Sequence, residues 1–438
     1  MPAKRTDLPK YDPAFMYDDR VGAEGMPSAE IGRLEKSLDA ARQAILSEPP
    51  GFFSIPDRGE ELRATEKLAR EVAGKFKTLI VIGIGGSDLG ARAIIGALGG
   101  RAKGMEVRFI GANTDPEEIA ALLKSVDLRK CALNVISKSG GTLETMATFL
   151  LLREALIKKV GVRKHAAHVI ATTDESGGAL REIARREGYR TLPVPQGIGG
   201  RYSALTTVGL FPAACAGIPV RALVEGARQV LADFKADAAK ESGPLLFAGL
   251  HVDASVRRGK TVTVLMPYSA ALREMGYWFR QLWAESLGKA RDRRGAQVHR
   301  GFTPVAALGA TDQHSQLQLY VEGPNDKCVT FLQVEKPRED FKVPVAYKDL
   351  PAVSWLGGKK FSDLIRAERE ATAEALADAG RPSGTVHVAR VSPESVGGLM
   401  MFFMLATAAA AELLDVNAYD QPGVEDGKRL IREAFKKN

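Results

Sequence analysis

Short apolar runs that end in glycine or hydroxyl residues recur along the first half of the chain. Residues 78–86 (TLIVIGIGG) are apolar up to their closing glycines, and the theme repeats at 106–115, 131–140 and 165–174. A nearly continuous apolar run of this length is typical of a strand that is buried on both faces. A helical stretch, such as residues 87–98, follows each strand. The alternation therefore predicts a parallel sheet covered by helices, with polar turns gathered at its carboxyl edge.

The same alternation restarts in the second half of the chain. Residues 259–269, 328–335 and 384–392 are strand-like, and residues 270–290 have the apolar spacing of an amphipathic helix. A chain of 438 residues is also too long for one ordinary core. We therefore predict an α/β protein of two αβα sandwich domains with mostly parallel sheets. The expected parts are an N-terminal helical and extended arm (1–60), a first αβα domain (61–225), a second αβα domain (226–400) and a helical C-terminal tail (401–438).

The most apolar stretch of the chain, residues 397–414, is expected to be a buried core helix. It holds about a dozen strongly apolar residues before Glu412, fewer than the ~18 that a membrane-spanning helix needs. Ser392 can cap the N-terminus of this helix, with Pro393 in its first turn. The N-terminal residues lack the apolar segment of a signal peptide. These features predict a cytoplasmic protein with no membrane contact.

The composition of the chain excludes several classes of partner and site. The formal net charge is +8, from 61 Lys and Arg against 53 Asp and Glu, and no block of five like charges occurs, so no nucleic-acid partner is expected. A mildly basic surface can still steer an anionic small molecule toward the protein. Cys131, Cys215 and Cys328 lie far apart and form no Cys-x-x-Cys pair. Their spacing argues for a reducing compartment and against both disulfides and a zinc cluster.

The glycine-rich turn GIGGSDLG (83–90) does not match a nucleotide-binding motif. A dinucleotide fingerprint that starts at Gly83 requires a glycine at position 88, where the chain has Asp88. A phosphate-binding loop of the Gly-x-x-x-x-Gly-Lys-Ser/Thr type is also missing from the sequence. Taken alone, this turn is as compatible with a tight structural turn as with a ligand site. Ser87 is expected to cap the helix that follows.

A second polar turn, SKSGGT (137–142), follows the apolar run 131–136. Both turns are expected at carboxyl ends of strands in one sheet. There, backbone N–H groups and small hydroxyls gather beside the N-terminus of the helix that follows. Such a nest fits a single phosphate group better than a nucleotide. We therefore predict a phosphate cradle, with the backbone of Gly140 and Gly141 close to the ligand. The side chains and loop residues expected to contact the phosphosugar are Gly86, Ser87, Ser137, Lys138, Ser139 and Thr142.

Together these motifs resemble a known family. VISKSGGTLET and GIGGSDLG are similar to the sugar-isomerase (SIS) fold of phosphosugar-binding proteins, which the two predicted αβα domains would adopt. Residues 197–210, 309–327 and 417–428 resemble signature stretches of glucose-6-phosphate isomerases, and QLWAESLGK (281–289) resembles the family's segment with the catalytic glutamate. The similarity runs from about residue 78 to 430 in the family's order. Gly141 departs from it, because a hydroxyl residue is common there.

The resemblance implies an interconversion of glucose 6-phosphate and fructose 6-phosphate by ring opening and an enediolate, without cofactor or metal. It makes Glu285 the base, and Leu282 and Trp283 nearby are able to desolvate the carboxylate and lift its pKa toward neutral. Without the resemblance, Glu285 would be taken for a solvated glutamate at a helix end. The other roles that it implies are charge stabilisation by Arg201, ring opening by His314 from a neighbouring subunit with Lys428, substrate contacts by Gln281 and Gln421, and a homodimer.

Three alternatives stay open at this point. A non-catalytic phosphosugar sensor would keep the 137–142 turn but would have no use for Glu285, Arg201, His314 and Lys428 together. A dehydrogenase with a dinucleotide-binding fold is disfavoured by Asp88. A dual phosphoglucose/phosphomannose isomerase would differ in the shape of the pocket around the sugar's C2, which the sequence does not decide.

Overall fold

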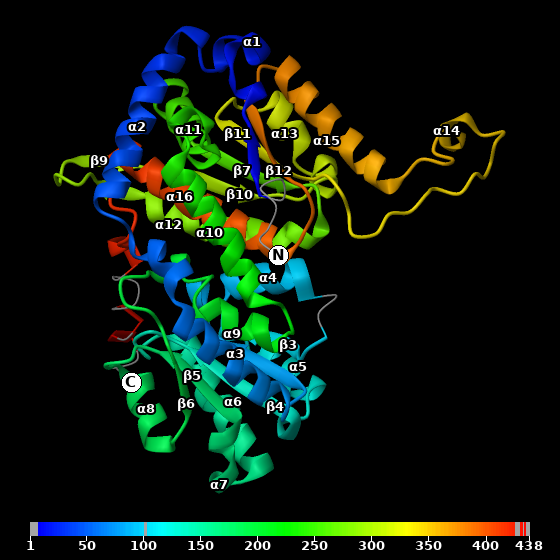
Figure 1. The fold of residues 1–438 in the computed structure, drawn as a ribbon. Helices are drawn as coiled ribbons and strands as arrows, with labels where there is room; N and C mark the ends of the chain where they lie inside the picture. Colours follow the sequence, from blue (N-terminus) through cyan, green and yellow to red (C-terminus); the bar gives the residue numbers. More distant parts are fainter. Residues whose placement is uncertain (1–7, 100–102, 425–429, 432, 435–438) are drawn as a thin grey trace.

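The chain folds into two αβα sandwiches, which lie one above the other in Figure 1. The structure is a computed structural model that describes residues 8–99, 103–424, 430–431 and 433–434. Each sandwich has a sheet of five strands, and a separate two-stranded ribbon pairs β8 (Lys289–Arg291) with β9 (Gln297–Arg300). The predicted α/β class with mostly parallel sheets is confirmed.

The first sandwich has a fully parallel sheet in the order β3-β2-β4-β5-β6. The side chains of strand β2 show that both faces of this sheet are covered. Leu79 and Val81 pack on one side with Val72 and Phe211, while Ile80 and Ile82 pack on the other side in a different cluster. The strands of this sheet are β2 (Thr78–Ile82), β3 (Glu106–Ile110), β4 (Cys131–Ile136), β5 (Val169–Thr173) and β6 (Arg190–Pro193).

Two groups of helices cover this sheet. The helices on the Leu79 face are α3 (Gly59–Ala73) and α9 (Thr207–Cys215), and those on the Ile80 face are α5 (Pro116–Ser125), α6 (Leu143–Val160) and α8 (Ala179–Glu187). The short α7 (Val162–His165) follows α6 at the end of the molecule farthest from the second sandwich (Figure 1). The remaining helix of this part, α4 (Leu89–Leu98), packs against α12 (Arg273–Leu287) of the second sandwich and so joins the two halves.

The second sandwich has the strand order β1-β12-β11-β7-β10, with all neighbours parallel except the edge strand β1. Val264 and Met266 face one cluster with α13 and α15, and Leu265 faces a larger cluster with α10, α11, α12 and α16. The strands are β1 (Lys10–Asp12), β7 (Val262–Pro267), β10 (Thr303–Ala306), β11 (Lys327–Val334) and β12 (Ser383–Val388). The helices are α10 (Val220–Ala236), α11 (Gly243–Arg258), α12 (Arg273–Leu287), α13 (Leu317–Glu322), α14 (Pro351–Ser354), α15 (Phe361–Asp378) and α16 (Pro393–Leu414).

The N-terminal residues belong to the second sandwich. β1, which lies in the segment expected to be an arm, pairs antiparallel with β12. After α1 (Asp18–Val21), the helix α2 (Ile31–Ser47) packs against α11 and α16. Residue 400, where the second domain was expected to end, lies within α16.

The apolar stretch at 397–414 is a core helix, as predicted. Ser392 caps α16 in a capping box with Ser395, and Pro393 is its first residue. Within the described ranges, α16 is the one helix that is long and apolar enough to cross a membrane, and 89% of its apolar window is buried inside the protein. Such burial is that of the central helix of a folded core.

Several predicted boundaries were wrong. The strands end before their polar turns, so that β2 stops at Ile82 and β12 at Val388. Ser87 was expected to cap α4, but it lies in a single 3-10 turn, and Asp88 occupies the capping position without a side-chain hydrogen bond to the helix backbone. β6, β10 and α15 were not predicted.

Candidate active site

A cavity of about 870 Å³ opens at the carboxyl ends of β2 and β4, where they meet α12 and the segment after α16. It brings together most of the residues predicted from the sequence. His314 is exposed on the turn Thr311–His314 of the second sandwich and does not line the cavity, and Lys428 lies outside the described residues. The predicted residues that line it are Gly86, Ser87, Ser137, Lys138, Ser139, Thr142, Arg201, Gln281, Glu285 and Gln421.

The turn between β4 and α6 contains the residues predicted to form a phosphate cradle. The Ser137 hydroxyl accepts a hydrogen bond from the Gly140 N–H (3.0 Å) and lies 3.3 Å from the Thr142 hydroxyl. Gly140 has φ +69°, and a Cβ there would collide with Leu180. Thr142 is the capping residue of α6, yet its side chain does not bond to the helix. The first N–H groups of α6 thus lack a side-chain cap at the wall of the cavity, an arrangement that favours an anion.

The 85–87 turn touches two other parts of the site. A Cβ on Gly86 would collide with the backbone of Gly200, so the absence of a side chain lets the two loops pack directly. Gly85 has φ +59°, and a Cβ there would lie 2.9 Å from the amide nitrogen of Gln281. These glycines therefore allow Arg201 and α12 to approach the turn that precedes α4.

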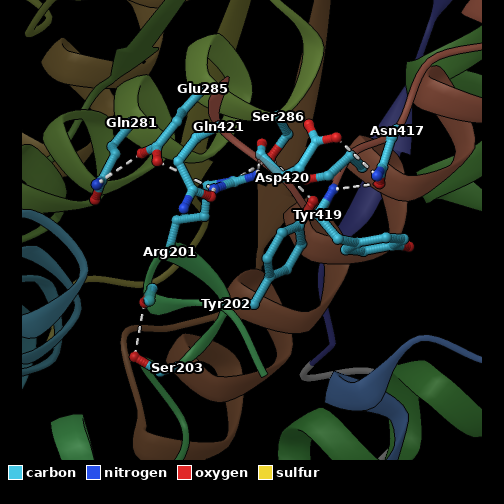
Figure 2. Close-up of polar contacts among 12 residues, drawn as sticks. Arg201, Tyr202, Ser203, Gln281, Glu285, Ser286, Asn417, Tyr419, Asp420 and Gln421 are labelled. Atoms are coloured by element: carbon cyan, nitrogen blue, oxygen red, sulfur yellow. Dashed lines mark hydrogen bonds and ion pairs between the residues drawn. The ribbon is translucent and has the colours of Figure 1, made fainter. Parts of the chain in front are cut away.

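Arg201 is buried and forms the centre of a polar network (Figure 2). Its Nε donates to Ser286 Oγ (2.8 Å), and its Nη1 donates to Glu285 Oε1 (3.1 Å) and Gln421 Oε1 (3.0 Å). Its Nη2 donates to the carbonyl oxygens of Ala418 (2.6 Å) and Asp420 (2.9 Å). The five bonds match the five N–H donors of a guanidinium. Arg201 is thereby fixed between α12 and the 417–421 segment.

Glu285 lies near the C-terminal end of α12, with its side chain 26% exposed. Its Oε1 faces Arg201, and its Oε2 accepts a hydrogen bond from the Gln281 amide (3.0 Å) one turn earlier. The Gln281 oxygen is buried and has no hydrogen-bond partner among the described residues. Because Gln281 lines the cavity, this oxygen is an unused acceptor at the cavity wall.

Three residues that support this network were not predicted: Ser286, Tyr202 and Lys289. The Tyr202 hydroxyl donates to Ser286 Oγ (3.0 Å), and burial raises the pKa of Tyr202 to about 12. Lys289 is buried, and its ammonium donates to the Glu285 carbonyl (2.8 Å) and the Asp420 carbonyl (2.7 Å). Burial lowers the pKa of Lys289 from its usual range. Each of these residues adjoins or lies in a predicted motif, but their contacts depend on which loops meet in the fold.

Asp88, beside the 85–87 turn, is buried with its carboxylate 2.6 Å from the Arg92 guanidinium. Burial raises the pKa of Asp88 to about 6, although the Arg92 charge acts in the opposite direction. One carboxylate oxygen has no hydrogen-bond partner in the part of the chain that the structure describes. Asp88 thus carries a charge that the fold only partly compensates.

The chain is similar in sequence to known proteins over the residues that form this cavity. A family model described as phosphoglucose isomerase matches residues 59–438, which include the whole described lining of the cavity. A glucose-6-phosphate isomerase of Carboxydothermus hydrogenoformans is 44% identical over 399 residues, covering 88% of this chain and 86% of the relative.

Two solved structures are similar over most of the chain. A hypothetical protein from Thermus thermophilus has a TM-score of 0.86 and 38% identity, covering 98% of this chain and 100% of that one. A glucose-6-phosphate isomerase from Chlamydia trachomatis has a TM-score of 0.77 and 27% identity, covering 86% of this chain and 73% of that one. The likeness thus extends through both sandwiches.

Proposed function

The chain belongs to the phosphoglucose isomerase family and is an aldose–ketose isomerase, and on that basis we propose how its residues interconvert glucose 6-phosphate and fructose 6-phosphate. The reaction opens the sugar ring and then moves a proton between C2 and C1 through an enediolate. It needs a phosphate anchor, a base near C1 and C2, a cation beside the developing oxyanion, and an acid for ring opening. The cavity offers groups for the first three tasks.

The phosphate is held in the first sandwich, by the 85–87 and 137–142 turns. Ser137, Ser139 and Thr142 have short side chains that leave room for phosphate oxygens and supply hydroxyl groups to bind them. The uncapped start of α6 adds backbone N–H donors. Lys138 lines the same cavity and supplies a cation. Gly141 leaves one side of this cradle open, because a Cβ there would meet only Ser139 Oγ at 3.5 Å.

Glu285 acts as the base that carries the proton between C2 and C1. The observation that supports this role best is the pairing of its carboxylate with the buried Arg201 at 3.1 Å, in the cavity that also contains the phosphate cradle. A positive charge that is already fixed by five protein acceptors stabilises the enediolate without reorganising during the reaction. Arg201 is therefore assigned to the oxyanion.

Gln281 and Gln421 orient the sugar. The Gln281 oxygen is an acceptor that bonds to none of the described residues, so it is suited to a substrate hydroxyl and not to the phosphate. Its amide nitrogen bonds to Glu285, which keeps this orientation. Gln421 accepts a hydrogen bond from Arg201 at the opposite wall, and its amide nitrogen remains a donor for the sugar.

The ring-opening acid is His314 of a second copy of the chain, acting with Lys428. His314 is exposed outside the cavity of its own chain, as expected for a residue that completes a neighbour's site. A homodimer is also supported by an arm, residues 341–361, that projects from the second sandwich (Figure 1). Large apolar side chains on this arm are 41–70% exposed, which is unusual for a monomer. They are Phe341, Val345, Tyr347, Leu350, Val353, Trp355 and Phe361.

A cytoplasmic location is proposed with this function. Cys131, Cys215 and Cys328 are all buried free thiols, and burial raises the pKa of Cys131 to about 11. Thiols kept neutral in this way are inert toward disulfide exchange. They are compatible with a reducing compartment.

The assignment of Glu285 is tested with Glu285→Gln, measured beside the parent and a Glu274→Gln control on the same helix. We expect kcat to fall about 10³-fold, within the range of general-base catalysis, while the Kd for the phosphosugar stays within about threefold. The control should keep the parent's activity, since Glu274 does not line the cavity. A kcat within about tenfold of the parent, a barrier change under about 1.4 kcal/mol, would refute the assignment.

A further inference from the structure

A second cavity, of about 670 Å³, lies at the carboxyl ends of β11 and β12, where the second sandwich meets the first. It shares no lining residue with the substrate cavity. Its walls include the last residue of α4, the 217–219 turn after α9, and the start of α16. In parallel α/β sheets, ligands bind outside the carboxyl ends of strands, so this position is a suitable one for a ligand.

The charges that line this cavity have one sign. Lys103, Lys336, Arg338 and Arg390 all contribute to its wall, and no aspartate or glutamate among the described residues does. We call this cavity with its four cations the basic pocket. The four come from three separate stretches of a chain whose formal net charge is only +8. Their gathering in one concave site concentrates positive potential there, because low-dielectric walls focus the field.

Carboxylates do lie near the basic pocket, but they do not line it. Glu335 bonds to His387 at 2.7 Å and precedes Lys336 in the chain. Glu394 belongs to the first turn of α16, and Glu339 follows Arg338 in the chain. Glu339, Arg338 and Arg390 each take part in further interactions, so none of the three is free. The wall of the cavity nevertheless has four cations and, among the described residues, no carboxylate.

The wall of the basic pocket is held in place by backbone contacts. Arg338 donates from Nε to the Val391 carbonyl (3.1 Å) and from Nη2 to the Ala97 carbonyl. It thereby joins the β12–α16 connection to the C-terminal end of α4. Ser392 caps α16, a helix of 22 residues whose N-terminal dipole adds positive potential to the same wall. The cations of a site fixed in this way lose little side-chain freedom when an anion binds.

We propose that the basic pocket binds a small polyanion, a metabolite that carries two or more phosphate or carboxylate groups. Four cations exceed what one phosphate monoester requires, and the volume is that of a small-molecule site. The cations are confined to one cavity and do not form the track along which a nucleic acid would bind. This site is distinct from the phosphate cradle and does not depend on the roles assigned to Glu285 or Arg201.

The test uses inorganic pyrophosphate as the probe, titrated calorimetrically into the full chain in low-salt buffer. The Lys336→Gln/Arg390→Gln variant removes two pocket cations and leaves the structural Arg338 in place. Its control is Lys159→Gln/Lys164→Gln, which makes the same charge change on exposed residues of α6 and α7. Ser137→Ala/Thr142→Ala separately weakens any binding of the probe to the substrate cavity.

We expect the pocket variant to weaken pyrophosphate binding at least about tenfold, a change of about 1.4 kcal/mol, and the control to match the parent. The pocket-dependent binding should persist in Ser137→Ala/Thr142→Ala. Equal losses in the pocket variant and the control would show a net-charge effect only and would overturn the proposal. So would pyrophosphate binding that depends on Ser137 and Thr142 alone, or unchanged binding in the pocket variant. A change of oligomeric state in the pocket variant, seen by light scattering, would mean that a second copy covers this cavity, and would also overturn it.

Discussion

Ser286 offers a sharp test of how the enzyme keeps Arg201 in position. Its hydroxyl is buried and accepts hydrogen bonds from Arg201 Nε (2.8 Å) and from the Tyr202 hydroxyl (3.0 Å). The substitution Ser286→Ala removes this shared acceptor and adds no bulk. It leaves two donors, one of them charged, without a partner in a region from which water is excluded.

The expected cost follows from those two donors. A buried donor that loses its partner costs about 1–3 kcal/mol, and more when it is charged, so we expect Ser286→Ala to reduce the free energy of unfolding by about 3 kcal/mol. Tyr202→Phe removes one donor together with its hydrogen bond, and should cost only about 1 kcal/mol because Ser286 keeps Arg201 as a partner. The double variant then leaves Arg201 Nε alone unpaired. We expect it to be more stable than Ser286→Ala by about 1 kcal/mol.

Urea unfolding followed by tryptophan fluorescence measures these differences, because Trp278 and Trp283 are buried on the helix that carries Ser286. Steady-state kinetics provide the second measurement. A guanidinium that shifts on losing the Ser286 contact is misplaced relative to the oxyanion, so kcat should fall by about 10- to 100-fold. KM should change little, since the phosphate cradle does not contact Ser286.

One result would refute this reasoning directly. If the double variant loses the full sum of the two single losses, or more, the hydroxyl of Tyr202 is not left unsatisfied by Ser286→Ala. An unchanged kcat in Ser286→Ala would show that Arg201 is held well enough by its other four acceptors. The positioning role of Ser286 would then be wrong, whatever happens to stability.

Three other predictions test separate parts of the molecule. Ser137→Ala and Thr142→Ala should each raise KM about tenfold, with smaller effects on unfolding than on binding, and an unchanged KM in both would contradict the cradle. Burial raises the pKa of Asp88 from 3.8 to about 6, so its stabilising effect as a neutral acid is present below about pH 4 and lost as the pH rises through 6. The stability of Asp88→Asn relative to the parent should therefore increase by about 2 kcal/mol between about pH 4.5 and 7.5, and a pH-independent difference in urea midpoints would exclude this effect. An equimolar mixture of the inactive variants Glu285→Gln and His314→Ala, allowed to exchange subunits at random, should recover about a quarter of the parent's activity if His314 completes a neighbour's site, because half of the dimers are mixed and each has one intact site; no recovery would place His314 outside the neighbour's site.

The fold could be predicted well where local pattern and burial agree. Apolar runs such as residues 78–82 lie in strands that are covered on both faces, so the continuous apolar pattern was enough to predict a strand. β10 and β6 were missed because each has only four residues and is only partly buried. β1 was missed for another reason. Its pairing with β12 is a contact between residues far apart in sequence, and three residues contain no periodic signal.

The residues of the candidate site also fall into those that the sequence could predict and those that it could not. Glycine- and hydroxyl-rich turns at strand ends could be recognised from the chain, because tight approach to an anion requires those residue types. Glu285 and Arg201 were identified through family resemblance, since one glutamate in a helix has no distinguishing local pattern. Ser286, Tyr202 and Lys289 could not be predicted, because their importance comes from three segments that only the folded chain brings together.

The arrangement of the site across the two sandwiches has a consequence for catalysis. The proposed phosphate cradle belongs to the first sandwich, and Glu285, the proposed base, belongs to the second, on α12. In this proposal the distance between phosphate and base is set by the packing of α4 on α12, and not by either sheet alone. At the cavity the two halves meet through Gly85 and the amide of Gln281, which bonds to Glu285. A Cβ at Gly85 would displace the Gln281 amide that bonds to Glu285, and the backbone there has φ +59°, which favours glycine. The glycine therefore keeps the Gln281–Glu285 pair in place beside the 85–87 turn.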